Sequence, residues 1–220
     1  MPGEKFGKRH RIAGMAASWA TSALLVVYGI TLILGLISLK SPNDPIADPY
    51  FTLMELLIVL IMPIMVLVMA ALHYYSSPES SLYSLMALIM MAIAAVITSS
   101  VHFVILTVSR HAEMAAMPWT SFLLSFKWPS IAYTLDILAW DWFFALSMLF
   151  AAPIFKSGRL EIAVRSLMIV SGLLSLAGLI GVPLADMQIR MIGVIGYAVV
   201  TPFLFLFLGI VFKCSMDRTL

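Results

Sequence analysis

Residues 130–155 read SIAYTLDILAWDWFFALSMLFAAPIF, an apolar stretch long enough to cross the ~30 Å hydrocarbon core of a lipid bilayer. Asp141 lies about eleven residues from its start, or ~16 Å along a helix. An ionised carboxylate near the bilayer midplane costs at least ~2.5–3.5 kcal/mol, so Asp141 is expected to face protein or water. Asp136 lies about one and a half turns earlier. The stretch therefore predicts a membrane-spanning helix and a polar site inside the protein.

The composition of the whole chain is that of a membrane protein. Of its 220 residues, 62% are hydrophobic and only 11% are charged, and the mean hydropathy is +1.05. Soluble domains average roughly a quarter charged residues. The net charge of +2 is too small to indicate nucleic-acid binding. The single cysteine, Cys214, excludes an intramolecular disulfide, and the Cys/His spacing predicts no metal site and identifies no cofactor.

Six apolar segments, each near or above the ~20 residues that span a bilayer, predict an all-α polytopic membrane protein. They cover residues 12–39, 51–74, 82–109, 130–155, 162–184 and 189–212, and turn-forming residues separate them. The first segment is much longer than the ~7–15-residue core of a signal peptide, so it is interpreted as a retained helix. We expect a basic cytoplasmic N-terminus over residues 1–11, one transmembrane domain over 12–213 and a cytoplasmic tail over 214–220.

The distribution of Lys and Arg predicts the orientation of these helices. With the N-terminus inside, the outer segments hold only four basic residues, whereas the inner segments hold nine, namely Lys5, Lys8, Arg9, Arg11, Lys156, Arg159, Arg165, Lys213 and Arg218. Because cytoplasmic loops carry an excess of Lys and Arg, both termini are predicted to be cytoplasmic, in a plasma or inner membrane.

The connection between the third and fourth segments differs from the other loops. Residues 118–129 place four apolar side chains on one helical face: Trp119, Phe122, Leu123 and Phe126. This pattern predicts a short helix in the outer interface, with its aromatic face toward the acyl chains. Two roles remain open for it, an interfacial anchor and a lid or lateral gate over a cavity.

Three ionisable residues from different segments are predicted to lie at a similar depth in the outer leaflet. Glu55 lies ~6 Å inside its outer helix end, Asp136 ~9 Å and His102 ~10 Å. Arg110 and Arg190, near outer helix ends, are expected to supply counter-charge. Asp141 is expected to point about 140° away from Asp136 on the same helix. The remaining predicted lining residues of this pocket are Tyr133, Trp140 and Tyr197.

Each of these residues also has a purely structural interpretation. Glu55 would simply reach the outer interface, and His102 would bond a serine such as Ser99 or a backbone carbonyl. Asp136 and Asp141 would form ion pairs with Arg110 or Arg190 that fix helix packing. Small residues along the first and fifth segments, including Ala17, Ser171 and Gly178, favour close helix contacts, within the chain or in a homo-oligomer.

Three functions remain open at this point. The first is a protein that binds or transports a small or amphipathic ligand, possibly coupled to protons, through Glu55, His102, Asp136 and Asp141. The second is a membrane-embedded enzyme acting on a lipid or isoprenoid, with Asp141 or Asp136 as general acid and His102 as base or relay. The third is an accessory subunit of a larger complex. An apolar tunnel that ends at Asp141 would favour the enzyme. A polar path between the two membrane faces would favour transport, and a polar face exposed to lipid would favour the accessory subunit.

Overall fold

The computed structural model describes residues 6–41, 44–111, 113 and 116–217. Among these residues, six helical spans are long and apolar enough to cross a membrane, and no strand occurs, which confirms the predicted six-span, all-α fold. The chain is an integral, multi-pass membrane protein. The basic residues Lys5 and Arg218, which entered the orientation argument, lie outside the described residues.

The first two spans are single helices, the third begins with a 3₁₀ turn, and the last three change their winding along their length. The elements in order are α1 (Lys8–Ile37), α2 (Tyr50–Tyr75), η1 (Pro78–Ser80), α3 (Ser81–Thr107), α5 (Thr120–Leu124), α6 (Ile131–Ile137), η2 (Leu138–Phe144), α7 (Ala145–Ala151), η3 (Ala152–Ile154), α8 (Arg159–Gly178), η4 (Leu179–Gly181), α9 (Met187–Val194), η5 (Ile195–Val200) and α10 (Thr201–Asp217). Two of these, η2 and η5, are π-helical, while η1, η3 and η4 are short 3₁₀ turns.

Both ends of the helical chain are longer than the apolar segments predicted. The helix α1 begins at Lys8, inside the basic stretch, because Lys and Arg are good helix formers. The last helix continues to Asp217. Arg11 of α1 donates a hydrogen bond from Nη1 to the carbonyl oxygen of Ser215 at 2.6 Å, which joins the two helices where they enter the bundle.

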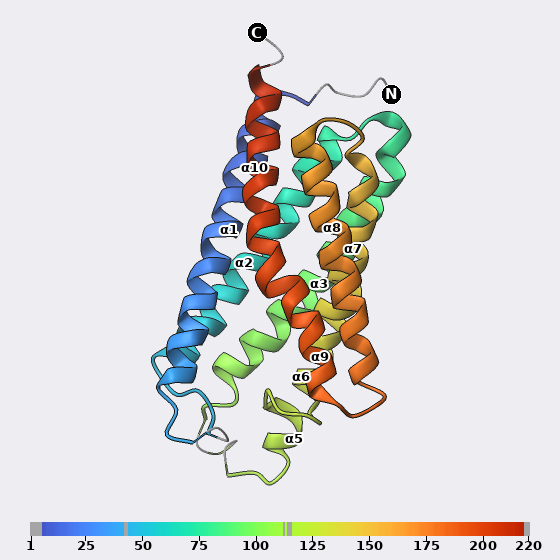
Figure 1. Ribbon diagram of the computed structural model, residues 1–220. Coiled ribbons are helices and arrows are strands. Elements are labelled where there is room, and N and C mark those ends of the chain that lie inside the picture. The colour runs from blue at the N-terminus through green and yellow to red at the C-terminus, as the bar shows by residue number, and fades with distance from the viewer. Residues whose placement is uncertain (1–5, 42–43, 112, 114–115, 218–220) are drawn as a thin grey trace.

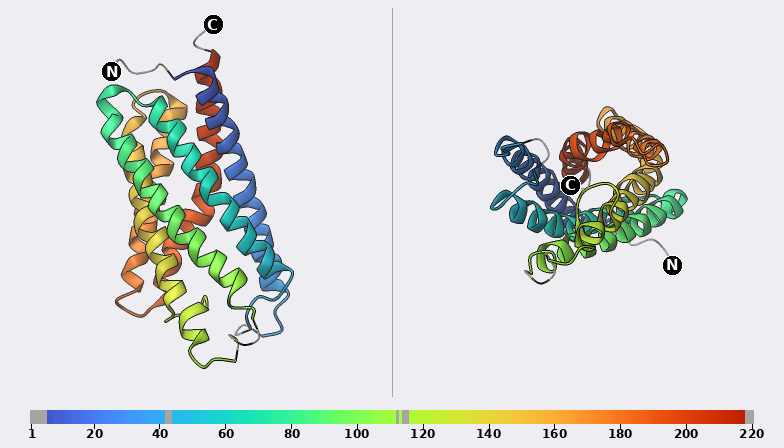
Figure 2. Two further views of the ribbon diagram at one scale, coloured as in Figure 1. Left: turned by 180° about the vertical axis from the view of Figure 1, so that it is seen from behind. Right: turned by 90° about the horizontal axis from the view of Figure 1, so that it is seen from below.

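The spans run side by side between two ends of the bundle (Figure 1). The first turn of α1 and the last turns of α10 lie at one end, which we call the terminal end; α5, α6 and α9 lie at the other, the loop end. Helix α1 packs against α2 and α10, α3 packs against α2 and α7, and α8 packs against α7 and α10. The two further views in Figure 2 show the same bundle from behind and from the loop end.

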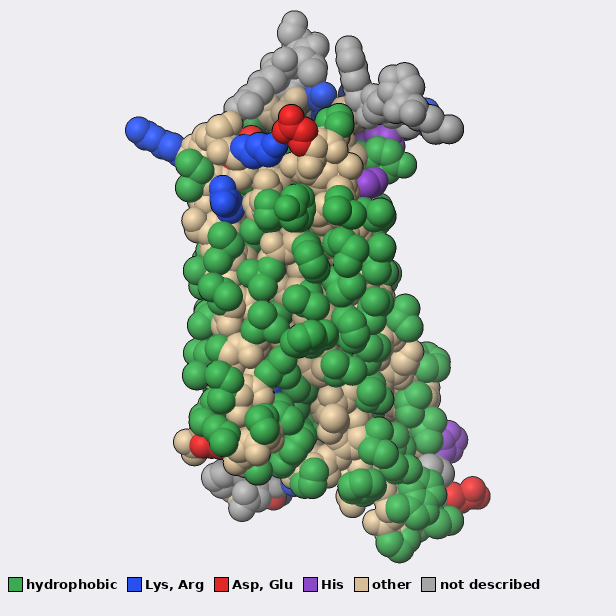
Figure 3. Space-filling model, turned by 90° about the vertical axis from the view of Figure 1, so that its right-hand side faces the viewer, with side chains coloured by type: hydrophobic (Ala, Val, Ile, Leu, Met, Phe, Trp, Pro, Cys, Tyr) green, Lys and Arg blue, Asp and Glu red, His purple; other side chains and the backbone are tan. Residues whose placement is uncertain are grey.

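The outer surface of the bundle is suited to a bilayer. On the face shown in Figure 3, hydrophobic side chains form a broad band between two ends at which charged side chains gather. Large apolar residues point outward along the spans; Val96 on α3, for example, is 67% exposed and Leu173 on α8 is 56% exposed. Water would disfavour so continuous an apolar surface, whereas lipid chains cover it at no cost.

The tightest core lies in the terminal half of the bundle. Met62, Met65 and Met69 of α2 and Met91 of α3 are at most 1% exposed, and Phe205 of α10 is fully buried beside them in the same cluster. Methionine has a flexible, unbranched side chain that fills irregular gaps between helices. Packed apolar side chains therefore occupy the interior of this half.

The predicted orientation can be tested with the natural cysteine, because Cys214 is exposed at the terminal end of α10. If the termini are cytoplasmic, a membrane-impermeant maleimide should label Cys214 only after the cells are permeabilised. In a Cys214→Ser background, Gln188→Cys at the loop end should be labelled in intact cells. The opposite pattern would invert the orientation.

Candidate functional site

A cavity of about 620 Å³ lies in the loop half of the bundle. Helices α1, α2, α3, α5, α6 and α9 and the segments η2 and η5 contribute to its walls, together with the connections that precede α2 and α6 and the residue Ser109 after α3. Seven of the residues singled out from the sequence line it: Glu55, His102, Tyr133, Asp136, Trp140, Arg190 and Tyr197.

His102 joins two carboxyl groups from two other helices. Its Nδ1 lies 2.8 Å from Oε2 of Glu55, and its Nε2 lies 3.4 Å from Oδ1 of Asp136. Glu55 is 3% exposed, His102 5% and Asp136 9%. A neutral imidazole donates one hydrogen bond and accepts another, whereas a protonated one donates both. We call Glu55, His102 and Asp136 the acid–histidine cluster.

The cluster forms because three helix segments present one residue each at the same level. Glu55 lies in the second turn of α2, and His102 lies near the end of the antiparallel neighbour α3. Asp136 lies on α6, whose start is fixed by Ser130: its Oγ accepts a hydrogen bond from the backbone N–H of Tyr133 at 3.1 Å. Since Glu55 is buried, it does not simply reach the outer interface.

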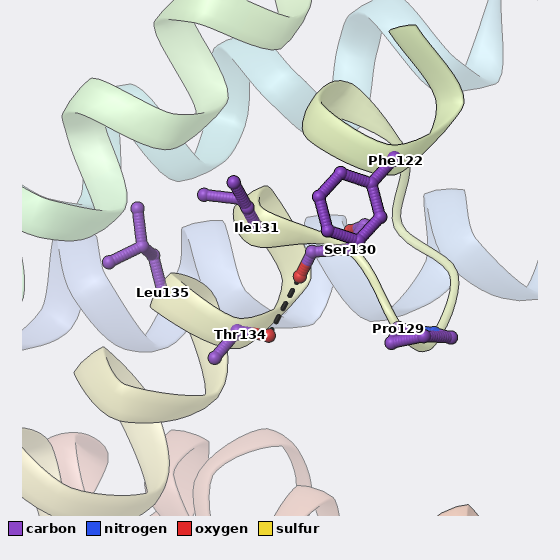
Figure 4. A pocket seen from close by; sticks show the side chains of 6 residues that line it. All are labelled: Phe122, Pro129, Ser130, Ile131, Thr134 and Leu135. Carbon is purple, nitrogen blue, oxygen red and sulfur yellow. Dashed lines mark hydrogen bonds between the residues drawn. The ribbon is translucent and has the colours of Figure 1, made fainter. Parts of the chain in front are cut away.

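The start of α6 also borders the outer surface. Thr134 donates a hydrogen bond from Oγ1 to the carbonyl oxygen of Ser130 at 2.7 Å, as Figure 4 shows. Beside this bond lies a shallow groove of about 230 Å³ between α5 and α6, lined by apolar side chains such as Phe122, Ile131 and Leu135. These three residues are 39–55% exposed, which suits the interface predicted for this part of the chain.

Arg190 also lines the cavity and is paired with Asp141. Its Nε lies 3.4 Å from Oδ2 of Asp141, and its Nη1 donates a hydrogen bond to the hydroxyl oxygen of Tyr133 at 2.9 Å. The guanidinium also lies over the rings of Tyr133, at 4.8 Å, and Tyr197, at 6.0 Å. Arg190 is 5% exposed and Asp141 is fully buried. Of the ion pairs considered from the sequence, this one forms.

Asp141 does not belong to the cavity lining, in contrast to the expectation that it would contact a ligand. It lies behind Arg190 and against the backbone of Gly193, where an added Cβ would collide with Oδ1 of Asp141. Gly193 in turn meets Gly178 of α8, at which a Cβ would lie 2.8 Å from the Cα of Gly193. The small residues of the fifth span thus serve a contact within the chain, and Asp141 contacts Arg190 rather than the cavity.

The two π-helical segments meet beside this pair. In a π-helix each N–H bonds the carbonyl five residues back, so the turn is wider than in an α-helix and its side chains are rotated. Trp140 in η2 packs on Tyr197 in η5, with ring centroids 5.0 Å apart. Both rings line the cavity, while Asp141, the next residue after Trp140, faces α9. The wider turns were not predicted from the sequence.

Arg110 lies outside the cavity, and its predicted role as counter-charge to the cluster is wrong. Its Nη2 donates to Oδ1 of Asp48 at 2.8 Å and to the hydroxyl of Thr52 at 2.5 Å. The Thr52 hydroxyl and, to a smaller extent, Arg110 hold the pKa of the Asp48 carboxyl below its usual range. Because these three residues lie where α2 begins and α3 has ended, they tie the two helices at the loop end.

This tie predicts a pH-dependent opening of the loop end. Since the pKa of Asp48 is lowered in the folded protein, the contact is fully present above the usual aspartate pKa of 3.8 and is lost as the pH falls through the lowered value. Near neutral pH, Asp48→Asn should speed hydrogen exchange of the amides at the start of α2 by at most about fivefold, because the pair is exposed. At acidic pH the exchange rates of these amides in the natural protein and in Asp48→Asn should become more similar. An equally large difference in exchange rate at low pH would contradict the pH-dependent opening.

Two lining residues were missed or misplaced by sequence reasoning. Tyr28 of α1 lines the cavity, and a tyrosine in the middle of an apolar segment was the available signal. Phe126 was predicted to face the acyl chains together with Trp119. However, α5 ends at Leu124, and the extended chain after it turns Phe126 inward, where its ring lies 5.0 Å from that of His102.

The chemistry available in the cavity is therefore hydrogen bonding and proton exchange among buried carboxyl, imidazole, phenol and guanidinium groups. Within the described residues, no group of three or more His, Cys, Asp or Glu side chains is arranged to hold a metal ion. The contacts of His102 are those of a hydrogen-bonded chain. Comparisons of this chain with protein-family models, with curated proteins and with solved structures found no match.

Proposed function

We propose that this membrane protein binds a small or amphipathic ligand in the cavity at its loop end. The observation that carries the proposal is the cavity of about 620 Å³, which combines a mainly apolar lining with a few convergent buried polar groups. Ligand sites have this character, with volumes of about 300–1,000 Å³. Buried ionisable groups inside a membrane are costly, so their concentration around one cavity favours a functional role over a packing role.

Binding is better supported than passage through the bundle. The cavity reaches from the loop end to Ile58 on α2, and the fully packed Ile61, Met62 and Met65 follow on the same helix toward the terminal end. An accessory subunit would be favoured by a polar face exposed to lipid. Glu55 and Arg190 do not form such a face, because both are at least nine-tenths buried.

A second candidate is an acid–base enzyme acting on the bound molecule. The specific observation in its favour is His102, which contacts a carboxyl group through each ring nitrogen. Such an arrangement allows a proton to be taken at Asp136 or Glu55 and replaced through the imidazole. The extracted ligand separates the candidates: an enzyme should yield two related compounds whose ratio changes in His102→Gln, whereas a binding protein should yield one.

Gly29 allows the cavity to be filled without disturbing the fold. It lines the cavity, and a Cβ built there meets nothing within 4 Å. Gly29→Leu should therefore place its side chain in the cavity, and both Leu and Ala are better helix formers than Gly. We expect native mass spectrometry from mild detergent to find a ligand on the natural protein and on Gly29→Ala. The ligand occupancy of Gly29→Leu should be lower than that of the natural protein by about tenfold or more, because overpacking costs about 1–3 kcal/mol.

The alanine variant is the matched control, because it shares the gain in helix propensity but adds only a methyl group. Thermal unfolding should show that neither variant is less stable than the natural protein. Equal ligand occupancy in the two variants would contradict the proposal, because the cavity would then be irrelevant to binding.

A further inference from the structure

The buried part of the cavity has an excess of negative charge. Glu55 and Asp136 both line it, and His102 between them supplies at most one positive charge. Arg190, which also lines the cavity, already has a counter-ion, because its Nε lies 3.4 Å from Oδ2 of Asp141. Asp44 and Lys127 also line the cavity, but both are exposed and their opposite charges balance. The two buried carboxylates, one imidazole and the Arg190–Asp141 pair therefore leave at least one negative charge without a partner when the carboxyl groups are ionised.

One oxygen of each carboxyl group is free to accept a hydrogen bond. Among the described residues, hydrogen bonds reach only Oε2 of Glu55 and Oδ1 of Asp136. The other oxygens are Oε1 of Glu55 and Oδ2 of Asp136. Both residues line the cavity, and they are only 3% and 9% exposed. Neither oxygen is among the fully enclosed polar atoms that lack a partner, so both are accessible from the cavity. A ligand that displaces water from them has to donate hydrogen bonds in its place, because an unpaired carboxylate oxygen is costly.

Aromatic rings surround the same space. Tyr28, Phe126 and Trp140 line the cavity from three different segments, and Phe126 already lies against His102. Aromatic faces attract cations through the ring quadrupole, and several rings around one position form the cage that binds ammonium groups. Carboxylates and aromatic rings together are the chemistry that recognises a positively charged nitrogen.

The cavity also extends far enough into the bundle to hold a hydrocarbon chain. On α1 its lining continues to Leu25, twelve residues or about 18 Å before the end of the helix at Ile37. On the other side it includes Val194 and Met191 of α9, and Met191 is 52% exposed. The lining thus runs from a buried side chain of α1 to an exposed side chain of α9.

We infer that the ligand is an amphiphilic amine; this inference rests on the proposed function of the cavity. Its ammonium group donates hydrogen bonds to Oε1 of Glu55 and Oδ2 of Asp136, with the rings of Tyr28 and Trp140 around it. Its hydrocarbon chain lies along the apolar walls, toward the exposed side chain of Met191. Arg190 also lines the cavity and is neutralised by Asp141.

The inference is tested with three probes that share one chain, namely dodecylamine, dodecanol and dodecanoate. Each is added to the purified full-length protein in nanodiscs of uncharged phospholipid near neutral pH, and binding is followed by the rise in unfolding temperature. Dodecylamine should bind the natural protein and Gly29→Ala at least about tenfold more tightly than dodecanol, since a hydrogen bond to a charged group contributes about one factor of ten or more. Dodecanoate should bind more weakly still.

Two variants test the recognition of the amine and the use of the cavity independently of each other. Glu55→Gln keeps the size of the side chain but removes its charge, and should reduce the preference for dodecylamine over dodecanol to less than about threefold. Gly29→Leu should weaken the binding of every probe by about tenfold or more. If dodecanol or dodecanoate binds as tightly as the amine and Gly29→Leu prevents this, the amine assignment is overturned while the binding function stands. If no probe distinguishes Gly29→Leu from Gly29→Ala, the proposed function itself fails.

Discussion

Replacement of Asp141 by asparagine is expected to destabilise the protein by about 3–5 kcal/mol, the cost of leaving a buried charge without its partner in soluble proteins. The fully buried carboxylate lies against the guanidinium of Arg190, which is itself 5% exposed. The amide keeps the shape of Asp141, so the loss should come from the unpaired cation. Unfolding by sodium dodecyl sulfate in mixed micelles measures this free energy.

The matched control for this substitution is Asp186→Asn at the start of α9. Its Oδ1 accepts hydrogen bonds from the N–H groups of Gln188 and Ile189, and asparagine caps a helix as well as aspartate does. The change should stay within about 0.5 kcal/mol. The double variant Asp141→Leu/Arg190→Leu should recover part of the loss, because no buried charge remains. Full stability of Asp141→Asn together with lost ligand binding would contradict this packing role and would assign Asp141 a role in binding through Arg190.

Replacement of His102 by leucine is the second change with a large expected effect. It removes the group that both Glu55 and Asp136 contact, so two carboxyl groups are left facing each other in a buried site. We expect a loss of about 3–5 kcal/mol in the free energy of unfolding, together with loss of ligand binding. The same unfolding assay, with and without the cavity ligand, measures both effects.

His73→Leu provides the comparison for His102, since it makes the same chemical change on the neighbouring helix. His73 lies near the terminal end of α2, is only partly buried, and its Nδ1 contacts the hydroxyl of Ser84 at 2.8 Å. Loss of one such hydrogen bond should cost about 0.5–1.5 kcal/mol and leave ligand binding unchanged. Equal effects of the two substitutions would show that the acid–histidine cluster has no special role.

The spans were predictable because their signal is local. A helix must carry about 20 apolar residues to cross the bilayer, and the chain interrupts its six apolar runs with turn-forming residues. The ends were less predictable, as Lys8 shows: a basic residue continues a helix readily, so the change of composition at residue 12 does not mark the helix start.

Part of the site followed from the fixed rise of a helix. Glu55, His102 and Asp136 were expected at one level, and the structure brings them into contact, because depth depends only on counting residues from a helix end. What counting could not provide is how the loops fold. Phe126 turns inward because α5 ends early, and Arg110 is held by Asp48 in a different connection.

The two π-helical segments have a consequence for recognising relatives of this chain. Each carries one residue more per hydrogen-bonded turn than an α-helix, so a single residue gained or lost there changes the winding locally while the flanking ladders persist. Alignments of homologous chains should therefore allow one-residue gaps within Leu138–Phe144 and Ile195–Val200. An alignment that forbids gaps inside a membrane span would shift Asp136 against Asp141 by one position, and would hide a shared acidic pair behind an apparent lack of homology.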